Sequence, residues 1–104
     1  MPKKQNHYSS EYTMLSILEY LCNSNFGKPV TKNHLMVNVS GIRQQRSDRI
    51  SHILNMLEKN ELINSLKTSD STYYEVTRKG IDAYSKWVKD YLDFVRYVNE
   101  INKY

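Results

Sequence analysis

The chain has 104 residues, of which 39% are hydrophobic and 25% charged, with three glycines and two prolines. This length favours a single domain and excludes a two-domain enzyme, and the composition excludes a long linker or a low-complexity tail. The formal net charge is +4, and residues 1–50 carry all of the excess, with seven basic residues against three acidic ones. A local positive field suits a polyanion such as nucleic acid, although it could equally serve to keep a surface soluble.

One cysteine, Cys22, excludes an internal disulfide and a multi-thiolate zinc site, which fits a reducing compartment. No stretch approaches the ~20 apolar residues of a membrane helix, and the first residues lack the apolar segment of a signal peptide. We therefore expect a cytoplasmic protein with no membrane partner.

Residues 1–9 are polar and are expected to form a flexible tail, and residues 10–77 the main folded unit. Ser10 can cap a first helix that ends near Asn23, because apolar residues recur in it at spacings of three and four. These residues are Met14, Leu15, Leu18, Leu21 and Cys22. Loop formers fill residues 23–29, and the Thr31 hydroxyl can then cap a short second helix. That helix contains His34, Leu35, Met36 and Val39.

A third helix follows the turn Ser40-Gly41-Ile42, where glycine permits the left-handed geometry that lets one helix stop and another start. It is expected to begin at about Arg43 or Ser47 and to end at Asn60, a residue tolerated in a left-handed helix end. One of its faces is apolar and is expected to point inward, through Ile50, Ile53, Leu54 and Leu57.

Residues 62–67 and 72–76 are expected to pair as a hairpin around a polar turn, because the second run is rich in strand-favouring residues. Thr77 can cap a fourth helix over residues 78–103. In it, apolar residues recur at alternating spacings of three and four, which is the pattern of a coiled-coil seam. The seam consists of Ile81, Tyr84, Val88, Tyr91, Val95 and Val98, and Trp87, Phe94 and Ile101 widen it.

The fourth helix is too long to lie on so small a body. At 1.5 Å per residue it measures roughly 39 Å, against a domain diameter of ~26 Å, so it must project. Its exposed rings would leave a patch of several hundred Å² in water, and a second copy of the chain is the simplest cover. We expect residues 78–104 to form a homodimer, parallel or antiparallel, through Tyr84, Trp87, Val88, Tyr91, Leu92, Val95 and Val98.

The order helix, helix, turn, helix, hairpin is that of a winged helix-turn-helix domain, in which the third helix enters a DNA major groove. The sequence therefore predicts a mainly helical fold with a small β-hairpin and a long C-terminal coiled-coil helix. The segment Tyr74-Glu75-Val76-Thr77-Arg78-Lys79-Gly80 resembles the "Y-x-[IVL]-T-x-K-G" strand-to-helix joint of archaeal and bacterial winged-helix regulators.

Over about residues 11–101 the chain most resembles small archaeal winged-helix DNA-binding proteins whose long C-terminal helix pairs antiparallel with that of a partner. This resemblance implies duplex-DNA binding as a homodimer, in transcription regulation or chromosome organisation.

The candidate DNA contacts lie mostly on the outward face of the third helix and at its start. Gln and Arg side chains can pair with adenine and guanine edges, and cations near the helix start suit phosphates. Asp48 departs from this pattern, because a carboxylate repels phosphate; it could instead serve the N-terminal dipole of a helix capped by Ser47. The hairpin tip carries Asp70, so minor-groove reading by the hairpin is not expected. The candidates are Lys32, Arg43, Gln44, Gln45, Arg46, Arg49, His52 and Lys67.

Other functions have less support in the sequence. The spacing of His7, His34 and His52 fits no zinc motif, and the chain shows no catalytic constellation or phosphate-binding glycine loop. We expect no enzyme activity, no metal, no cofactor and no evident small-molecule ligand. Two alternatives stay open beside the regulator: a winged-helix module that binds another protein, and an architectural protein that binds DNA without sequence preference.

Overall fold

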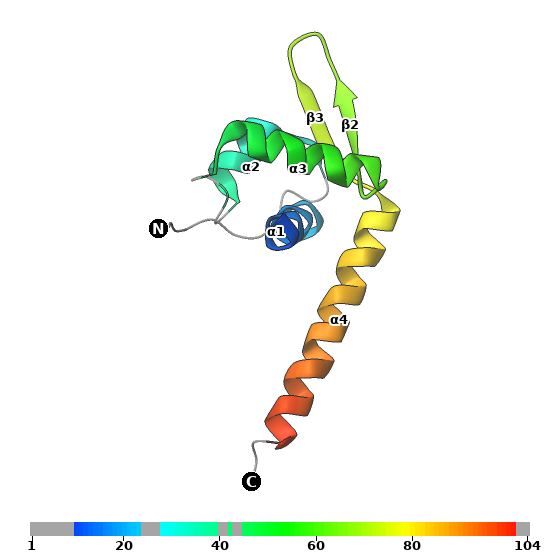
Figure 1. The fold of residues 1–104 in the computed structure, drawn as a ribbon. Helices are drawn as coiled ribbons and strands as arrows, with labels where there is room; N and C mark the ends of the chain where they lie inside the picture. The colour runs from blue at the N-terminus through cyan, green and yellow to red at the C-terminus, as the bar shows by residue number, and fades with distance from the viewer. Residues whose placement is uncertain (1–9, 24–27, 40–41, 43–44, 102–104) are drawn as a thin grey trace, which may run out of the picture.

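The computed structural model describes residues 10–23, 28–39, 42 and 45–101, and the elements they form follow the expected order (Figure 1). The fold is a winged helix-turn-helix with a long C-terminal helix, mainly helical with one small sheet. The predicted fold class is therefore confirmed. The elements are α1 (Ser10–Asn23), β1 (Val30–Thr31), α2 (Lys32–Asn38), α3 (Ser47–Lys59), β2 (Ile63–Lys67), β3 (Thr72–Val76) and α4 (Arg78–Ile101).

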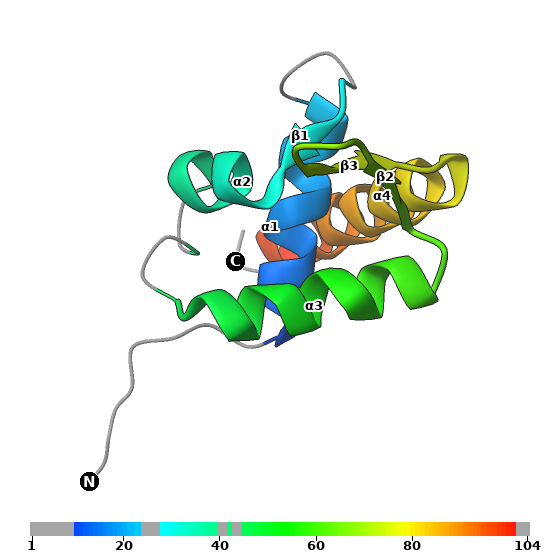
Figure 2. The ribbon, with the colours of Figure 1, turned by 90° about the horizontal axis from the view of Figure 1, so that it is seen from above.

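The core lies where α1, α2 and α3 meet the sheet, with α1 at the centre and α2 and α4 on opposite sides of it (Figure 2). Burial of aliphatic side chains is the main stabilising term in such a core, at ~25 cal/mol per Å² of apolar surface. The predicted inward face of α3 is confirmed. The buried apolar residues are Ile17, Leu18, Leu21, Val30, Leu35, Val39, Ile42, Ile50, Ile53, Leu54, Leu57 and Ile63.

The sheet has three antiparallel strands in the order β1-β3-β2. The predicted hairpin is confirmed, with pairs running from Ile63 opposite Val76 to Lys67 opposite Thr72. Strand β1, which pairs Val30 with Tyr74, was not predicted. Two residues are too few to show the alternation by which a strand is recognised.

The sequence located most helix ends to within one residue. Asn23 ends α1 as expected, and the Thr31 hydroxyl accepts a 3.1 Å hydrogen bond from the His34 amide, which confirms it as the cap of α2. Ser10, expected as a cap, is instead the first residue of α1. Ser40 and Gly41 of the predicted turn lie outside the described residues.

Both ends of α3 differ from the prediction in detail. The N-cap position is Arg46, whose side chain makes no capping bond, so Ser47 begins the helix and does not cap it. At the other end Asn60 has φ −90°, and the left-handed residue is Glu61, with φ 66°. The left-handed position therefore falls one residue later than the sequence suggested.

The joint between β3 and α4 explains the motif around Thr77. Its hydroxyl donates to the Glu61 carbonyl (2.6 Å) and accepts from the Gly80 amide (3.0 Å), so the predicted cap is confirmed. Gly80 is buried, and a Cβ there would fall inside contact distance of the Leu62 carbonyl oxygen and 2.7 Å from a methyl group of Val76. Only glycine fits at this close approach.

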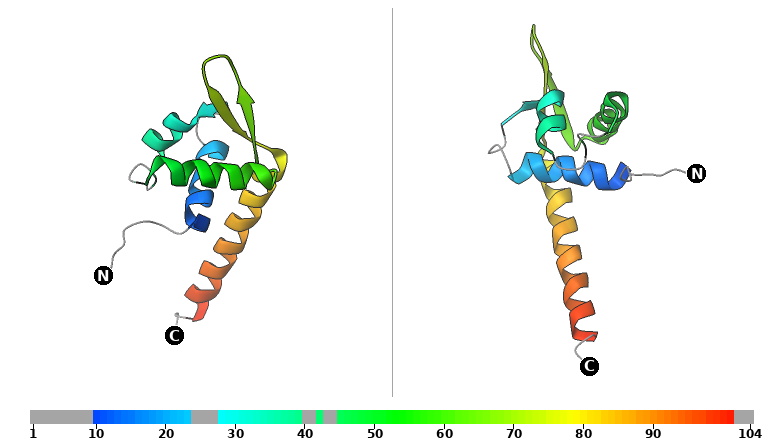
Figure 3. Two further views of the ribbon diagram at one scale, coloured as in Figure 1. Left: turned by 45° about the horizontal axis from the view of Figure 1, so that its top comes forward. Right: turned by 90° about the vertical axis from the view of Figure 1, so that its left-hand side faces the viewer.

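Helix α4 contacts α1 along its first half and then extends away from the body, as the sequence predicted (Figure 3). Its predicted seam residues Tyr84, Val88, Val95 and Val98 are partly covered. The other two described seam residues, Ile81 and Tyr91, are exposed, and so are Trp87, Leu92, Phe94 and Tyr97 beside the seam. None of the helices in the described part of the chain is long and apolar enough to cross a membrane.

Candidate nucleic-acid interface

The outer face of α3 is polar and is not covered by any other described part of the chain. Opposite the buried face lie exposed Asp48, His52, Asn55 and Lys59, with Ser51 at the edge. These positions follow from the period of the helix, since residues seven apart, such as His52 and Lys59, share a face. His52 lies on this face as predicted, and Lys59, which was not predicted, shares it.

Arg46 stands at the start of this face with its side chain 84% exposed. Its guanidinium lies 3.1 Å from the Asp48 carboxylate, which is also exposed. Ion pairs of this kind contribute at most ~1 kcal/mol, because water and salt screen them. Arg46 is therefore available to an anionic partner, with Asp48 as its competitor.

Asp48 has a second role in the first turn of α3. One of its carboxylate oxygens accepts a 2.9 Å hydrogen bond from the Arg49 amide. A negative charge at this end of a helix interacts favourably with the helix dipole. The interpretation of Asp48 as a residue that serves the helix start is therefore supported.

Gln45 was predicted to face outward, and this is wrong. Its side chain is buried, with 8% exposure, because the residue precedes α3 and turns inward. Its amide donates to the Thr13 hydroxyl of α1 (3.1 Å), and its carbonyl oxygen accepts from Arg49 Nε (2.6 Å). Gln45 thus holds Arg49 in place instead of presenting its own amide to a ligand.

Arg49 is half-buried and flanks the outer face of α3, as the sequence analysis expected. The hydrogen bond from its Nε to Gln45 orients the guanidinium at this edge. Arg43 and Gln44, also candidate contacts, lie outside the described residues.

Lys32 links α2 to α3. Its ammonium group donates to the Ser47 hydroxyl (2.6 Å) and the Ser51 hydroxyl (2.8 Å), and approaches the Ser47 carbonyl at 3.4 Å. These bonds keep a positive charge beside the first turn of α3. To bind a phosphate directly, the Lys32 ammonium must give up its hydrogen bond to one of these serine hydroxyls.

The hairpin, or wing, carries little positive charge at its tip. Lys67 is exposed at the end of β2, and the Thr68 hydroxyl closes the turn by accepting from the amides of Asp70 and Ser71. Asp70 is exposed beside them. The tip of the wing therefore offers one cation and one anion, which is too little for strong electrostatic attraction to DNA.

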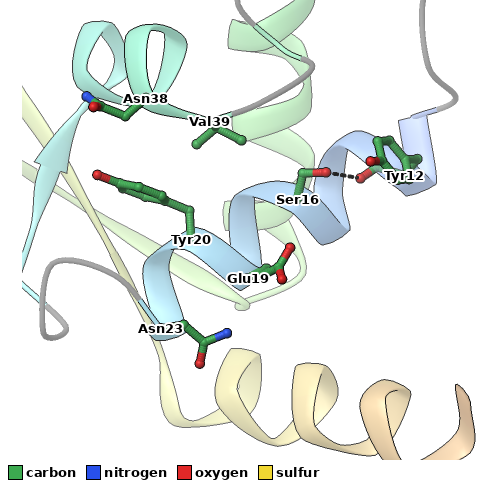
Figure 4. A pocket seen from close by; sticks show the side chains of 7 residues that line it. All are labelled: Tyr12, Ser16, Glu19, Tyr20, Asn23, Asn38 and Val39. Carbon is green, nitrogen blue, oxygen red and sulfur yellow. Dashed lines mark hydrogen bonds between the residues drawn. The ribbon is translucent and has the colours of Figure 1, made fainter. Parts of the chain in front are cut away.

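A polar cleft of about 220 Å³ opens between α1 and the end of α2 (Figure 4). Its side chains include Tyr20, Glu19 and Asn38, and Tyr20 shares a 2.7 Å hydrogen bond with His34. Because the exposed Glu19 carboxylate would repel phosphate, this cleft is not part of a nucleic-acid face. Among the described residues, no group of three or more His, Cys, Asp or Glu is placed to hold a metal ion.

Comparison with protein-family models and with curated proteins finds no match. A solved structure described as an ArsR-like transcriptional regulator from Rhodococcus sp. RHA1 is similar in fold, with a TM-score of 0.48 and 17% sequence identity. The similarity covers 90% of this chain and 88% of that one. The class defined by the chain's own structure is the winged helix-turn-helix fold.

Proposed function

We propose that this chain is a duplex-DNA-binding protein, a homodimeric transcriptional regulator that inserts α3 into the major groove. The observation that carries the proposal is the uncovered polar face of α3, with Arg46 exposed at its start and Arg49 held at its flank. A recognition helix needs such a face, because its first residues approach the base edges while the body stays outside the groove.

The contacts divide by chemistry. Arg46, Lys59 and Lys67 are exposed cations suited to phosphates, and Lys32 adds its charge at the first turn of α3. Asn55 and His52 project from the middle of the face, where an Asn amide can pair with adenine N6 and N7. Arg49, together with Arg43 and Gln44, is proposed to reach bases or phosphates next to the start of the helix.

The proposed dimer uses residues 78–104 as its contact. Residues 78–89 carry four basic residues and one acidic residue, whereas residues 90–101 carry one basic and three acidic. Antiparallel helices place the basic half of one against the acidic half of the other, whereas parallel helices set like charges side by side. We therefore propose an antiparallel pair, which would space two copies of α3 along the duplex.

The test is a double variant, Arg46→Ala with Arg49→Ala, measured for affinity to duplex DNA at fixed salt. Each lost arginine contact costs about 1–3 kcal/mol, so affinity should fall at least about tenfold. The control is Arg78→Ala with Lys79→Ala, which removes the same charge from the start of α4, ahead of the seam that begins at Ile81, and sedimentation must show that both variants are still dimers. Circular dichroism must show both variants folded. Equal affinity of the two variants would contradict the proposal.

A second candidate is a winged-helix module that binds another protein, and the observation that favours it is the weakly charged wing tip with Asp70. Such a module leaves duplex DNA unbound. A third outcome is uniform DNA coverage, expected of an architectural protein. Footprinting on a random duplex pool separates these outcomes, because a regulator protects a discrete, two-fold symmetric site.

A further inference from the structure

An apolar groove of about 460 Å³ runs between α1 and the first half of α4. The Asn23 amide donates a 3.1 Å hydrogen bond to the Tyr84 hydroxyl and so joins the two helices. The walls of the groove are formed by Glu11, Tyr12, Met14, Leu15 and Leu18 of α1 and by Ala83, Tyr84 and Trp87 of α4.

The apolar stripe of α4 is wider than one partner helix can cover. At about 100° per residue, the arc from Tyr97 round to Leu92 spans roughly 220°, about twice the width of a single apolar face. Near Trp87, α1 lies beside part of this arc. Phe94 and Tyr97 lie on the same side of α4 as Trp87 but beyond α1, and they are 63% and 62% exposed. Among the described residues, none lies beside this side of the second half of α4 as α1 lies beside the first half.

We propose that, in the homodimer, the aromatic side of the second half of α4 fills the groove between α1 and α4 of the other subunit. The partner's Phe94 would enter near Leu15, and the partner's Tyr97 near Ala83. This inference rests on the proposed dimer and adds α1 to its interface.

Symmetry supports this arrangement. Two antiparallel helices lie in one plane and are related by a two-fold axis perpendicular to it. Rotation about this axis keeps the upper side of each helix on the upper side of the pair, so equivalent residues of the two helices project from the same side of the plane. An axis through the middle of the seam sets the partner's Val95 level with Tyr84. Phe94 and Trp87 project from the same side of α4, and α1 lies on that side. The partner's Phe94 therefore projects from the side of the helix pair on which α1 lies. A parallel pair leaves both Phe94 rings without an α1 beside them.

The exposed surface is of the right size for such an interface. Trp87, Tyr91, Phe94 and Tyr97 are each roughly half exposed. Rings of this kind bury about 150–250 Å² each when covered, so the four supply roughly 400 Å². A specific interface covers about 800 Å² per partner, and the groove and the aliphatic seam must supply the remainder.

The test is disulfide cross-linking between subunits in the full chain without DNA. Cys22 is first replaced by Ser, and two proteins are then made in this background, one with Leu15→Cys and one with Phe94→Cys. Mixed and oxidised, they should give a covalent dimer on a non-reducing gel, while the Leu15→Cys protein alone gives none. A Val95→Cys protein is the control for direction, because its cysteines meet each other only in a parallel pair.

The possible outcomes separate the two proposals. Cross-linking of Leu15→Cys to Phe94→Cys supports the inference. The inference is overturned if sedimentation shows a dimer but this mixture does not cross-link. It is also overturned if the Val95→Cys protein cross-links to itself. Neither result contradicts the proposed dimer or the proposed DNA face. A monomer at micromolar concentration overturns both the inference and the proposed dimer.

Discussion

The guanidinium of Arg46 lies 3.1 Å from the carboxylate of Asp48, at the start of the helix that carries the proposed DNA face. Both side chains are exposed, so the pair is weak and open to exchange. A phosphate that approaches Arg46 must displace Asp48, and Asp48 repels it while doing so. The same carboxylate accepts from the Arg49 amide, so its presence has a structural reason.

Replacing Asp48 by Asn should strengthen DNA binding and slightly weaken the fold. Loss of the competing charge should raise affinity about two- to fivefold at low salt, the factor expected from an exposed ion pair. Loss of the charge near the helix dipole should lower the free energy of unfolding by about 0.3–1 kcal/mol. Fluorescence anisotropy with a labelled duplex measures the first effect and urea unfolding the second. Asp70→Asn on the wing is the control for net charge. An equal rise in DNA affinity in both variants would show that Asp48 does not compete specifically for Arg46.

Replacing Gln45 by Leu should destabilise the protein by about 1–3 kcal/mol, because it removes two hydrogen bonds from a buried site. It should also weaken DNA binding, since Arg49 loses the acceptor that orients it. Urea unfolding and duplex affinity report the two effects. Asn55→Leu makes a similar change on the exposed face and should alter the free energy of unfolding by less than ~0.5 kcal/mol. If Gln45→Leu is equally harmless, the buried bridge contributes nothing.

Gly80→Ala should cost about 1–3 kcal/mol of stability, because the added methyl group meets the backbone of Leu62 and forces the joint between β3 and α4 to shift. Ser85→Ala, on the exposed side of the same helix, should be neutral or slightly stabilising. Thermal unfolding monitored by circular dichroism compares the two. A Gly80→Ala protein as stable as the wild type would mean that the joint is not tightly packed.

Val95→Glu should give monomers, because the seam would then bury a charge without a partner. Ser85→Glu adds the same charge outside the seam and should leave a dimer. Sedimentation equilibrium at micromolar concentration measures this, and Trp87, the single tryptophan, should emit at a longer wavelength in the monomer. A Val95→Glu protein that sediments like the wild type would remove the seam from the interface.

The sequence was sufficient for the elements whose signal is periodic or local. The apolar spacing of α3 identified its inward face, and the hydroxyls of Thr31 and Thr77 marked the starts of α2 and α4. Lys59 could have been found from the same period, because it lies seven residues after His52.

The rest depended on contacts between distant residues. Gln45 was placed outward by extending the helical period back past Ser47, where the helix in fact begins. Its burial depends on Thr13, thirty-two residues away, which local spacing cannot reveal. Strand β1 likewise exists only because β3 passes beside it.

A salt titration of the wild-type protein on a random-sequence duplex is the most direct test of whether the α3 face binds duplex DNA. If Arg46, Lys59 and Lys67 of each subunit each neutralise one phosphate, the logarithm of the association constant should fall with the logarithm of salt concentration with a slope of about −5. Binding that is absent at low salt, or that does not change with salt, would contradict the claim.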